Sequence, residues 1–226
     1  MRDKIIENFL ITQKKFFEDT HLLMVPNNHS DHNSDPEYWD ILLREIKTDP
    51  KKWENRNALD FGCGCGRNLV NLSTLADWKT IDGCDISKQN ADYSKEWFEK
   101  NNTKNGILCK TWENNGIDIK PADENYYDFI MSHIVFQHIS NYSVRYSIMQ
   151  DMYRALKPNG FISLHFMDLK VGTSYFDNCT EFKNCRVENP DFLVKDFEKI
   201  GFKNIKCEVG SDYFLHVKSY YIKGTK

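Results

Sequence analysis

Three glycines stand at every second position of the stretch LDFGCGCGRN, where Gly62, Gly64 and Gly66 follow the acidic residue Asp60. Each glycine costs conformational entropy on folding, so such a run indicates a place where side chains cannot be tolerated. The residues before the run are apolar, and those after it have helical character. A turn of bare backbone between a strand and a helix lets a ligand approach closely, and it usually accommodates part of a nucleotide.

The spacing of this turn separates two kinds of nucleotide site. The dinucleotide fingerprint G-x-G-x-x-G, read from Gly62, requires glycine at a position that is Arg67 here. The observed pattern D-x-G-x-G-x-G begins with a carboxylate and places its third glycine closer to the second. It suits a ligand with a cationic end and no pyrophosphate, and it disfavours a nicotinamide-dependent dehydrogenase.

The rest of the chain supplies the elements that would position this turn. From residue 57 onwards, short apolar runs alternate with amphipathic segments of helical length. Expected strands cover 57–62, 80–87, 106–112, 127–133, 160–167, 204–209 and 213–224, and expected helices cover 67–76, 88–100, 141–157 and 191–201. Strands that alternate with helices imply crossover connections and a mainly parallel sheet with helices on both faces. We therefore expect an α/β fold with a single Rossmann-like, doubly wound, seven-stranded sheet that ends in an antiparallel strand pair.

Residues 1–56 are expected to form an N-terminal helical cap, in front of a domain that covers 57–226. The cap should contain one helix with an apolar face, a loop at 26–35, which is rich in turn formers, and a second helix in PEYWDILLREIKT. Tyr38 and Trp39 could fold over a ligand from this cap, or they could form the cap's own apolar seam.

Five segments of the chain resemble the class I S-adenosylmethionine-dependent methyltransferases. The first motif of that family is similar to LDFGCGCG, and TIDGCDIS resembles the strand that ends on the family's ribose-binding acidic residue, here Asp85. YYDFIMSHIVFQHI, MYRALKPNGFISLHF and FEKIGFKNIKCEV resemble the fourth strand with its turn, the turn into the fifth strand and the entry into the terminal strand pair. The resemblance covers about residues 57–226 and implies S-adenosyl-L-methionine as the cofactor.

The resemblance also implies roles for individual residues. Asp60 would act near the methionine amino group of the donor, and the backbone of residues 62–66 would line its carboxylate and ribose. Asp85 would accept hydrogen bonds from the ribose hydroxyls, and either Glu113 or Asn114 would read the adenine. The expected donor-binding residues are Asp60, Gly62, Cys63, Gly64, Gly66, Asn68, Asp85, Ile86, Glu113, Asn114, Ser132 and His133. Without a donor, Asp60 could simply hold the turn, and Asp85 could be a turn residue at a strand end.

Histidines stand near the ends of the fourth and fifth expected strands. Methyl transfer is an in-line displacement at a carbon activated by a sulfonium, so the protein mainly aligns the acceptor and, for a hydroxyl, removes a proton. Histidine titrates in the range that this step requires. His138 is the first candidate for a general base, because a histidine at the QHI position sometimes has this role in similar small-molecule enzymes. His133 and His165 are further candidates, and each histidine could instead bond to the backbone and shape the pocket.

Several acceptor classes are excluded by missing motifs. The fourth strand lacks the (Asp/Asn)-Pro-Pro-aromatic motif of amino-methylating DNA enzymes and the paired glutamates of arginine methyltransferases, and the chain has no Pro-Cys dipeptide for cytosine methylation. Ser132 and His133 do not match the metal-ligating residues of catechol enzymes, so no metal is expected. Segment 168–190 is long for a connection, and its aromatic and amide side chains could line an acceptor pocket. We expect metal-independent methylation of a small molecule such as a sugar or glycan precursor, with oxygen favoured over nitrogen.

Composition sets the remaining expectations. A formal net charge of -3 gives no basic field that would attract nucleic acid or an anionic membrane. The 7 cysteines form no CxxC pair and no zinc-ligand cluster, which favours free thiols in a reducing compartment. No stretch has the length and apolarity of a membrane span, and the first residues do not resemble a secretion signal. We expect a cytoplasmic monomer or homodimer that binds neither nucleic acid nor membranes.

Two other functions fit parts of the same sequence. A nicotinamide-dependent Rossmann oxidoreductase is disfavoured by Arg67 and by the terminal strand pair. A catalytically silent methyltransferase-like subunit that supports a partner would need no catalytic histidine, although the glycine run and Asp85 favour retained cofactor binding.

Overall fold

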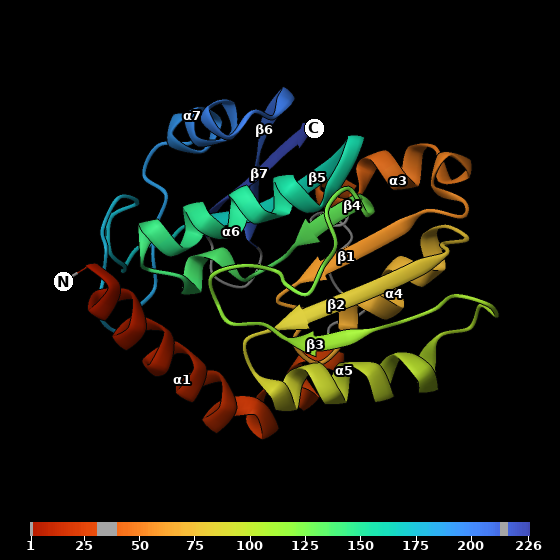
Figure 1. The fold of residues 1–226 in the computed structure, drawn as a ribbon, viewed down its shortest axis with the longest axis horizontal. Coiled ribbons are helices and arrows are strands. Elements are labelled where there is room, and N and C mark those ends of the chain that lie inside the picture. Colours follow the sequence, from red (N-terminus) through yellow and green to blue (C-terminus); the bar gives the residue numbers. More distant parts are fainter. Residues whose placement is uncertain (1, 31–39, 213–216) are drawn as a thin grey trace.

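A seven-stranded sheet with the strand order β3-β2-β1-β4-β5-β7-β6 forms the centre of the protein (Figure 1). The structure, a computed structural model, describes residues 2–30, 40–212 and 217–226. The strands are β1 (Asn57–Phe61), β2 (Thr80–Asp85), β3 (Thr111–Glu113), β4 (Tyr127–Ser132), β5 (Leu156–Asp168), β6 (Lys203–Asp212) and β7 (Val217–Thr225). All neighbouring pairs from β3 to β5 are parallel, whereas β7 is antiparallel to both β5 and β6. The expected mainly parallel sheet with a terminal antiparallel pair is confirmed.

Helices cover both faces of the sheet. The longer ones are α1 (Arg2–Ser30), α4 (Arg67–Leu75), α5 (Lys88–Asn101), α6 (Tyr142–Ala155) and α7 (Asp191–Ile200), and the short ones are α3 (Arg44–Thr48), η2 (Pro50–Trp53) and η3 (Phe136–His138). Several helix ends follow the capping preferences of their residues. Ser87 and Asn141 accept hydrogen bonds from the first turns of α5 and α6, and Gly201 ends α7 in a left-handed conformation.

Two apolar clusters hold these layers together. Alternate residues of the strands point to opposite faces, so Leu59 joins the cluster beneath α6 and α7, whereas Ala58 joins the cluster beneath α3 and α4. The strands β1, β2 and β4 are buried along their whole length, as expected for parallel strands covered on both faces. Phe9 of α1 belongs to the first cluster, so residues of the N-terminal segment share the core of the sheet. The expected division of the chain at residue 57 stays a prediction.

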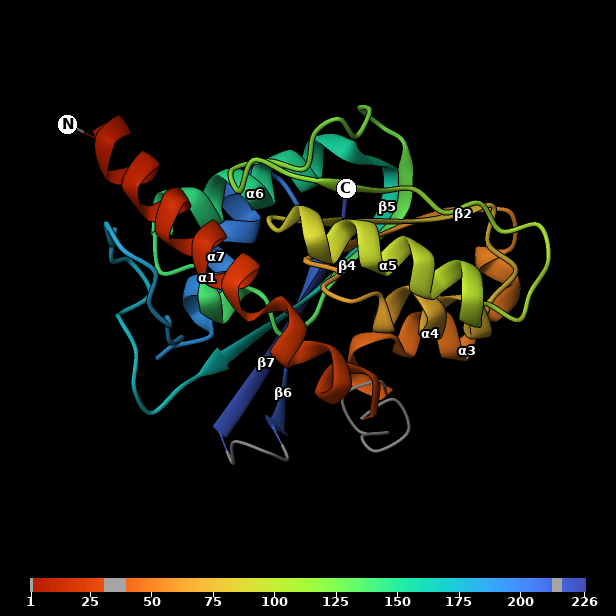
Figure 2. The ribbon, with the colours of Figure 1, turned by 90° about the horizontal axis from the view of Figure 1, so that it is seen from below.

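The N-terminal helix α1 crosses the edge of the sheet at which β1, β2 and β4 end (Figure 1 and Figure 2). It continues to Ser30, so the loop expected at 26–35 was wrong for its first part. Turn-forming residues lower helix propensity, but propensity alone is a weak guide to where a helix ends. Tyr38, Trp39 and the rest of that loop lie outside the described residues. None of the described helices is long and apolar enough to cross a membrane.

The boundary between α6 and β5 also differs from the expectation, which extended the helix to residue 157. Leu156 already pairs with Tyr127 of β4, and the register then shifts before Phe161 pairs with Phe129. Pro158 lies in this irregular stretch of β5, where its missing N–H breaks no regular ladder bond. Proline therefore marks the irregularity inside a strand here, while the helix ends earlier.

Candidate functional site

A cavity of about 400 Å³ lies at the carboxyl ends of the central strands. It adjoins β1 and β4, the two neighbours between which the strand order reverses, and open parallel sheets bind ligands at that position. Its walls come from α1, the glycine turn, the ends of β2 and β3, and the turn after β4. The residues lining it are Gln13, Phe17, Phe61, Gly62, Cys63, Gly64, Cys65, Arg67, Asn68, Asp85, Ile86, Asn90, Asn114, Gly116, His133, Ile134, Val135, His138, Ile139 and Ile148.

The three glycines of the turn have different surroundings. A Cβ atom at Gly62 would lie 2.3 Å from a methyl carbon of Val135, and one at Gly66 would lie 2.8 Å from the backbone oxygen of Ser94. A Cβ atom at Gly64 would meet nothing within 4 Å. All three residues have positive φ angles. Packing inside the protein therefore requires two of the glycines, and the turn presents open backbone to the cavity at Gly64.

The carboxylate of Asp85 fixes the glycine turn to the end of β2. Its Oδ2 accepts a hydrogen bond from the Gly64 N–H at 3.0 Å, and its Oδ1 accepts from the Ser87 N–H at 2.9 Å and from the Asn90 side chain at 3.2 Å. Asp85 is buried but lines the cavity. Its orientation is thus set by the protein, and a carboxylate oxygen has further lone pairs with which to accept from a ligand hydroxyl.

Asp60 is fully buried in β1, behind the cavity wall. Among the described residues, neither of its carboxyl oxygens has a well-formed hydrogen bond, although the Asn68 side chain is close enough to lower its pKa. Burial raises the pKa of Asp60 to about 8, the Arg67 charge opposes that shift, and the Asp85 charge adds to it. An unpaired buried carboxyl is unfavourable, so a ligand with a cationic group would supply the partner that Asp60 lacks.

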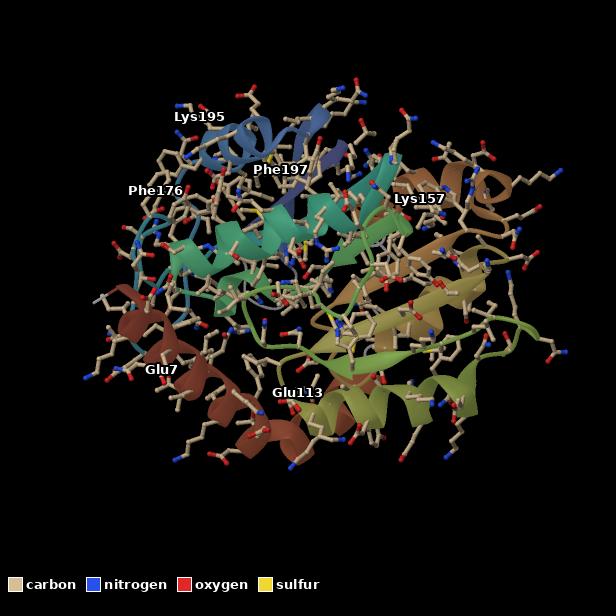
Figure 3. The ribbon with its side chains drawn as sticks, in the orientation of Figure 1. Glu7, Glu113, Lys157, Phe176, Lys195 and Phe197 are labelled. Atoms are coloured by element: carbon tan, nitrogen blue, oxygen red, sulfur yellow. The ribbon has the colours of Figure 1, made fainter. Side chains whose placement is uncertain are left out.

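The structure distinguishes the two candidates that follow β3. Asn114 lines the cavity, its N–H donates to the Asp85 carbonyl at 2.8 Å, and its Oδ1 accepts from the Gly116 N–H at 2.8 Å. Glu113, which lies next to α5 and α1 in Figure 3, instead forms an ion pair with Lys14 of α1 and does not line the cavity. Asn114 is therefore the better placed of the two to meet a ligand.

The remaining expected donor-binding residues divide into two groups. Cys63, Asn68 and Ile86 line the cavity, as expected. Gly66 and Ser132 do not, because Gly66 packs against α5 and the Ser132 hydroxyl donates to the Phe61 carbonyl at 2.9 Å.

Burial raises the pKa of the Cys63 thiol well above its usual range, so the thiol is not activated as a nucleophile. No three metal-ligating side chains cluster in the described part of the chain.

His133 and His165 are buried side by side, with ring centres 4.9 Å apart. Burial lowers the pKa of both, to about 3 for His165, and His133 is lowered further by its neighbours His165 and Arg67. The Arg67 guanidinium lies 3.3 Å from Nδ1 of His133. Because a guanidinium only donates, Nδ1 accepts and the proton of the neutral ring is on Nε2. His133 lines the cavity, whereas His165 lies behind it.

His165 holds an unusual backbone in place. Its Nδ1 accepts a hydrogen bond from the Ile134 N–H at 3.2 Å. Ile134 has a φ angle of 59°, which is strained for a β-branched residue. Strained backbone of this kind persists only where surrounding contacts enforce it, and it tends to occur at functional sites. His165 therefore supports the turn after β4 from behind the cavity.

His138, at the end of η3, also lines the cavity. Its Nδ1 lies 3.0 Å from Oδ1 of Asn184, in the long segment between β5 and α7. Burial lowers the pKa of His138, and the hydrogen bond with Asn184 opposes that shift. Of the three candidate histidines, His133 and His138 line the cavity and His165 lies behind it. The hydrogen bond to Asn184 joins His138 to segment 168–190.

Sequence reasoning missed the contribution of α1 to this site. Gln13 and Phe17 line the cavity, and the Gln13 side chain donates to the His138 carbonyl at 3.3 Å. Phe17 packs edge-on against the His138 ring, with centroids 5.7 Å apart. The apolar pattern of α1 indicates a buried face but not which surface it covers. Arg67 could have been recognised, because it directly follows the glycine turn.

The model of the methyltransferase domain family matches residues 59–164. Two curated relatives match part of the chain. An uncharacterized protein of Rickettsia prowazekii is 27% identical over 136 residues, which are 59% of this chain and 52% of that protein. Mouse arsenite methyltransferase is 29% identical over 129 residues, which are 54% of this chain and 33% of that enzyme. The chain thus spans about half or less of the length of these relatives.

Solved structures show the same fold at low sequence identity. An S-adenosylmethionine-dependent methyltransferase of Methanosarcina mazei has a TM-score of 0.63 and 16% identity, with 78% of this chain and 95% of that chain covered. Phosphoethanolamine N-methyltransferase 2 of Haemonchus contortus, in complex with phosphomonomethylethanolamine and S-adenosylhomocysteine, has a TM-score of 0.61 and 14% identity, with coverages of 83% and 52%. The [4+2]-cyclase SpnF has a TM-score of 0.69 and 12% identity, with coverages of 95% and 97%. This fold therefore supports more than one reaction.

Proposed function

We propose that this chain, whose residues 59–164 match the methyltransferase domain family and whose fold is that of S-adenosylmethionine-dependent methyltransferases, methylates a hydroxyl oxygen of a small uncharged molecule, such as a sugar or glycan precursor. The observation that carries the proposal is a cavity with an unpaired buried carboxyl on one side and a neutral histidine on the other. The first feature suits the donor, and the second suits removal of a hydroxyl proton.

The donor side of the cavity is lined by residues 62–65, Arg67, Asn68, Asp85, Ile86 and Asn114, with Asp60 buried directly behind them. These residues fit S-adenosyl-L-methionine, since Asp60 would pair with the amino group and Asp85 would accept from the ribose hydroxyls. The open backbone at Gly64 leaves room for the methionine and ribose portions. When bound, the donor supplies a methyl carbon on a positively charged sulfur.

The acceptor side consists of Gln13, Phe17, His133, Ile134, Val135, His138 and Ile139. Among the described residues that line the cavity, Asp85 and Arg67 carry the charges; Asp85 lies on the donor side, and the Arg67 guanidinium contacts His133 where the two sides meet. Around His138 the lining side chains Gln13, Phe17 and Ile139 are neutral, which favours an uncharged acceptor group beside that ring. The Phe17 ring gives a flat apolar surface suited to the carbon face of a sugar ring, and Gln13 can bond to its hydroxyls.

In the proposed reaction His138 acts as the general base. The acceptor oxygen bonds to the methyl carbon while the bond from that carbon to sulfur breaks, and the hydroxyl proton passes to the imidazole. Burial keeps His138 neutral, so its lone pair is available at neutral pH. The donor leaves as the neutral thioether.

The test begins with donor binding and continues with an acceptor screen. Thermal stabilisation by S-adenosylhomocysteine is expected, followed by turnover of S-adenosylmethionine with a neutral hydroxylated acceptor. His138→Gln should reduce turnover about 100-fold or more with nearly unchanged donor affinity. Lys183→Ala, at an exposed position in segment 168–190, is the control. Stabilisation by NAD instead would indicate the oxidoreductase, and no donor binding at millimolar concentration would indicate the silent subunit.

A further inference from the structure

Two hydrogen-bond partners determine which nitrogen of His138 carries its proton. Nδ1 lies 3.0 Å from Oδ1 of Asn184, and an amide oxygen only accepts, so Nδ1 must carry the hydrogen. Nε2 lies 3.3 Å from the side-chain nitrogen of Gln137, and an amide nitrogen only donates, so Nε2 must present its lone pair. Both contacts lead to the same tautomer of the neutral ring.

Asn184 is held in this position by its backbone. The Thr173 N–H donates to the Asn184 carbonyl at 2.9 Å, and the Thr173 hydroxyl donates to the same oxygen at 3.2 Å. On the other side, the Cys185 N–H donates to the Gln137 carbonyl at 2.7 Å. Segment 168–190 is therefore attached to η3 directly beside His138, although the two are far apart in the sequence.

Neutral groups surround the His138 ring. From α1 it meets Phe17 at 5.7 Å between ring centroids, and from segment 168–190 it meets Phe182 at 6.2 Å. Its polar contacts are with the two amides, Gln137 and Asn184. Because none of these groups is ionised, hydrogen bonding sets the tautomer rather than a nearby charge.

His133 shows the opposite arrangement in the same cavity. Its Nδ1 accepts from Arg67, which leaves the proton on Nε2. A ring in that state can donate a hydrogen bond through Nε2 but cannot accept a proton there. The hydrogen-bond partners therefore make Nε2 of His138 able to receive a proton, whereas Nε2 of His133 already carries one.

We propose that Asn184 is a positioning residue that keeps the proton of His138 on Nδ1, so that Nε2 receives the proton of the acceptor hydroxyl. This inference rests on the proposed function, in which His138 is the base. As the oxygen bonds to the methyl carbon, the hydroxyl O–H bond breaks and the proton becomes the second ring proton of His138. Oδ1 of Asn184 then accepts from a charged imidazolium, and such hydrogen bonds are stronger than neutral ones. The Gln137 amide gives up its long contact with Nε2 when the acceptor arrives.

The tautomer can be measured without knowledge of the acceptor. Nitrogen-15 NMR of the histidine rings would be recorded for the protein saturated with S-adenosylhomocysteine, with His138→Gln used to assign the signal. The wild type is expected to show the Nδ1–H form of His138. Because Gln137 also favours the Nδ1–H form, the variants are compared in a Gln137→Leu background, where Asn184 is the polar partner that keeps the tautomer. In that background Asn184→Leu should shift the ring towards the Nε2–H form, whereas Lys183→Ala, at the exposed neighbouring position, should leave it unchanged. A wild-type ring protonated on Nε2, or a tautomer that Asn184→Leu leaves unaltered in the Gln137→Leu background, would overturn the proposal.

A second variant keeps the test valid if Asn184→Leu disturbs the segment. Asn184→Asp preserves the shape and adds a negative charge beside Nδ1, so it should raise the pKa of His138 by about 1 or more. With an acceptor from the screen, Asn184→Leu should lower kcat at least 10-fold with little change in the donor KM, and Asn184→Asp should move the acid limb of the kcat profile to higher pH. An unmoved pKa in Asn184→Asp contradicts the inference. If the tautomer is as stated but His138→Gln keeps its turnover, the assignment of the base is what fails.

Discussion

The donor side of the cavity comes from residues 60–114, whereas the acceptor side joins α1, the turn after β4 and, behind His138, segment 168–190. The donor side is held by contacts between neighbouring elements, as in the hydrogen bonds of Asp85 to Gly64, Ser87 and Asn90, which join residues at most 21 positions apart. The acceptor side depends on contacts between segments far apart in the chain, as between Gln13 and His138 or Asn184 and His138. Charge also differs, since ionisable carboxyls lie on the first side and neutral rings and amides on the second.

Because the two sides differ in this way, mutations on them are expected to change different measured properties. Changes on the donor side should alter stability or donor affinity, because rigid backbone and buried carboxyls are concentrated there. Changes on the acceptor side should alter turnover and leave donor affinity nearly constant. A mutation on the acceptor side that changes donor affinity would show that the two sides are coupled.

The largest effect on stability is expected within the glycine turn. Gly66→Ala should reduce the free energy of unfolding by about 2 to 4 kcal/mol, because the new methyl group would meet the backbone of Ser94 at a strained positive φ. Gly64→Ala, whose Cβ would enter open space, should lose only about 1 kcal/mol from backbone strain. Urea unfolding of both variants checks the difference, and equal losses would contradict the distinct roles of the two glycines.

Donor affinity should respond most strongly to Asp85. Asp85→Ala removes the acceptor proposed for the ribose hydroxyls and releases the Gly64 N–H, so binding of S-adenosylhomocysteine should weaken by about 1 to 3 kcal/mol. Asp92→Ala, at an exposed position of α5, is the matched control for removal of one carboxylate. Calorimetric titration gives both affinities. Unchanged affinity in Asp85→Ala would remove this residue from the donor site.

A pH dependence is expected from Asp60. Burial raises the pKa of Asp60 to about 8 in the folded protein, so between about pH 4 and pH 8 the folded state keeps a proton that the unfolded chain has lost. The stabilisation from this group is therefore complete at low pH and is lost as the pH rises through that range. Binding of a cationic amino group should expel the proton, and donor affinity should increase by up to about tenfold per pH unit below pH 8.

Calorimetry in buffers of different ionisation enthalpy can detect this proton. The wild type should release about one proton when S-adenosylhomocysteine binds near pH 7, and Asp60→Asn should release none from this site. Proton release that is identical in the two proteins would place the donor's amino group away from Asp60.

The smallest effect is expected for Ile134 on the acceptor side. Ile134→Asn should change the free energy of unfolding by less than about 1 kcal/mol, because asparagine tolerates the left-handed backbone and relief of strain offsets the lost apolar burial. Donor affinity should stay constant. A loss well above this range, measured by urea unfolding, would mean that the Ile134 side chain contributes more than its strained backbone costs.

The sequence predicted the donor side better because its signals are local. The glycine turn, the strand before it and the position of Asp85 at the end of β2 can be recognised within one stretch of the chain, and the order of strands and helices follows from their alternation. The choice between Glu113 and Asn114 could not be made, because it depends on Lys14 of a helix packed from the N-terminus. Asn184 carried no local signal, since its relation to His138 exists only in the folded chain.

The same limits apply to the interpretation of the glycines. Open backbone for a ligand was the reason expected for all three, yet Gly62 and Gly66 are required by contacts with Val135 and Ser94. Spacing identifies where a turn is tight but does not tell which neighbour makes it so. The roles assigned to the site residues stay predictions until the binding and turnover experiments are done.

The packing around Gly62 and Gly66 has a consequence for reading related sequences. A descendant protein that had given up methylation and served only as a scaffold would still need both glycines in order to fold. The glycine signature would then persist long after the activity had disappeared. The buried carboxyl of Asp60 is different. It lowers the stability of the ligand-free protein, so it is retained only while a cationic ligand binds beside it. An apolar residue at the position of Asp60, together with an intact glycine turn, would therefore be the better sign of a protein that has lost its methyltransferase activity.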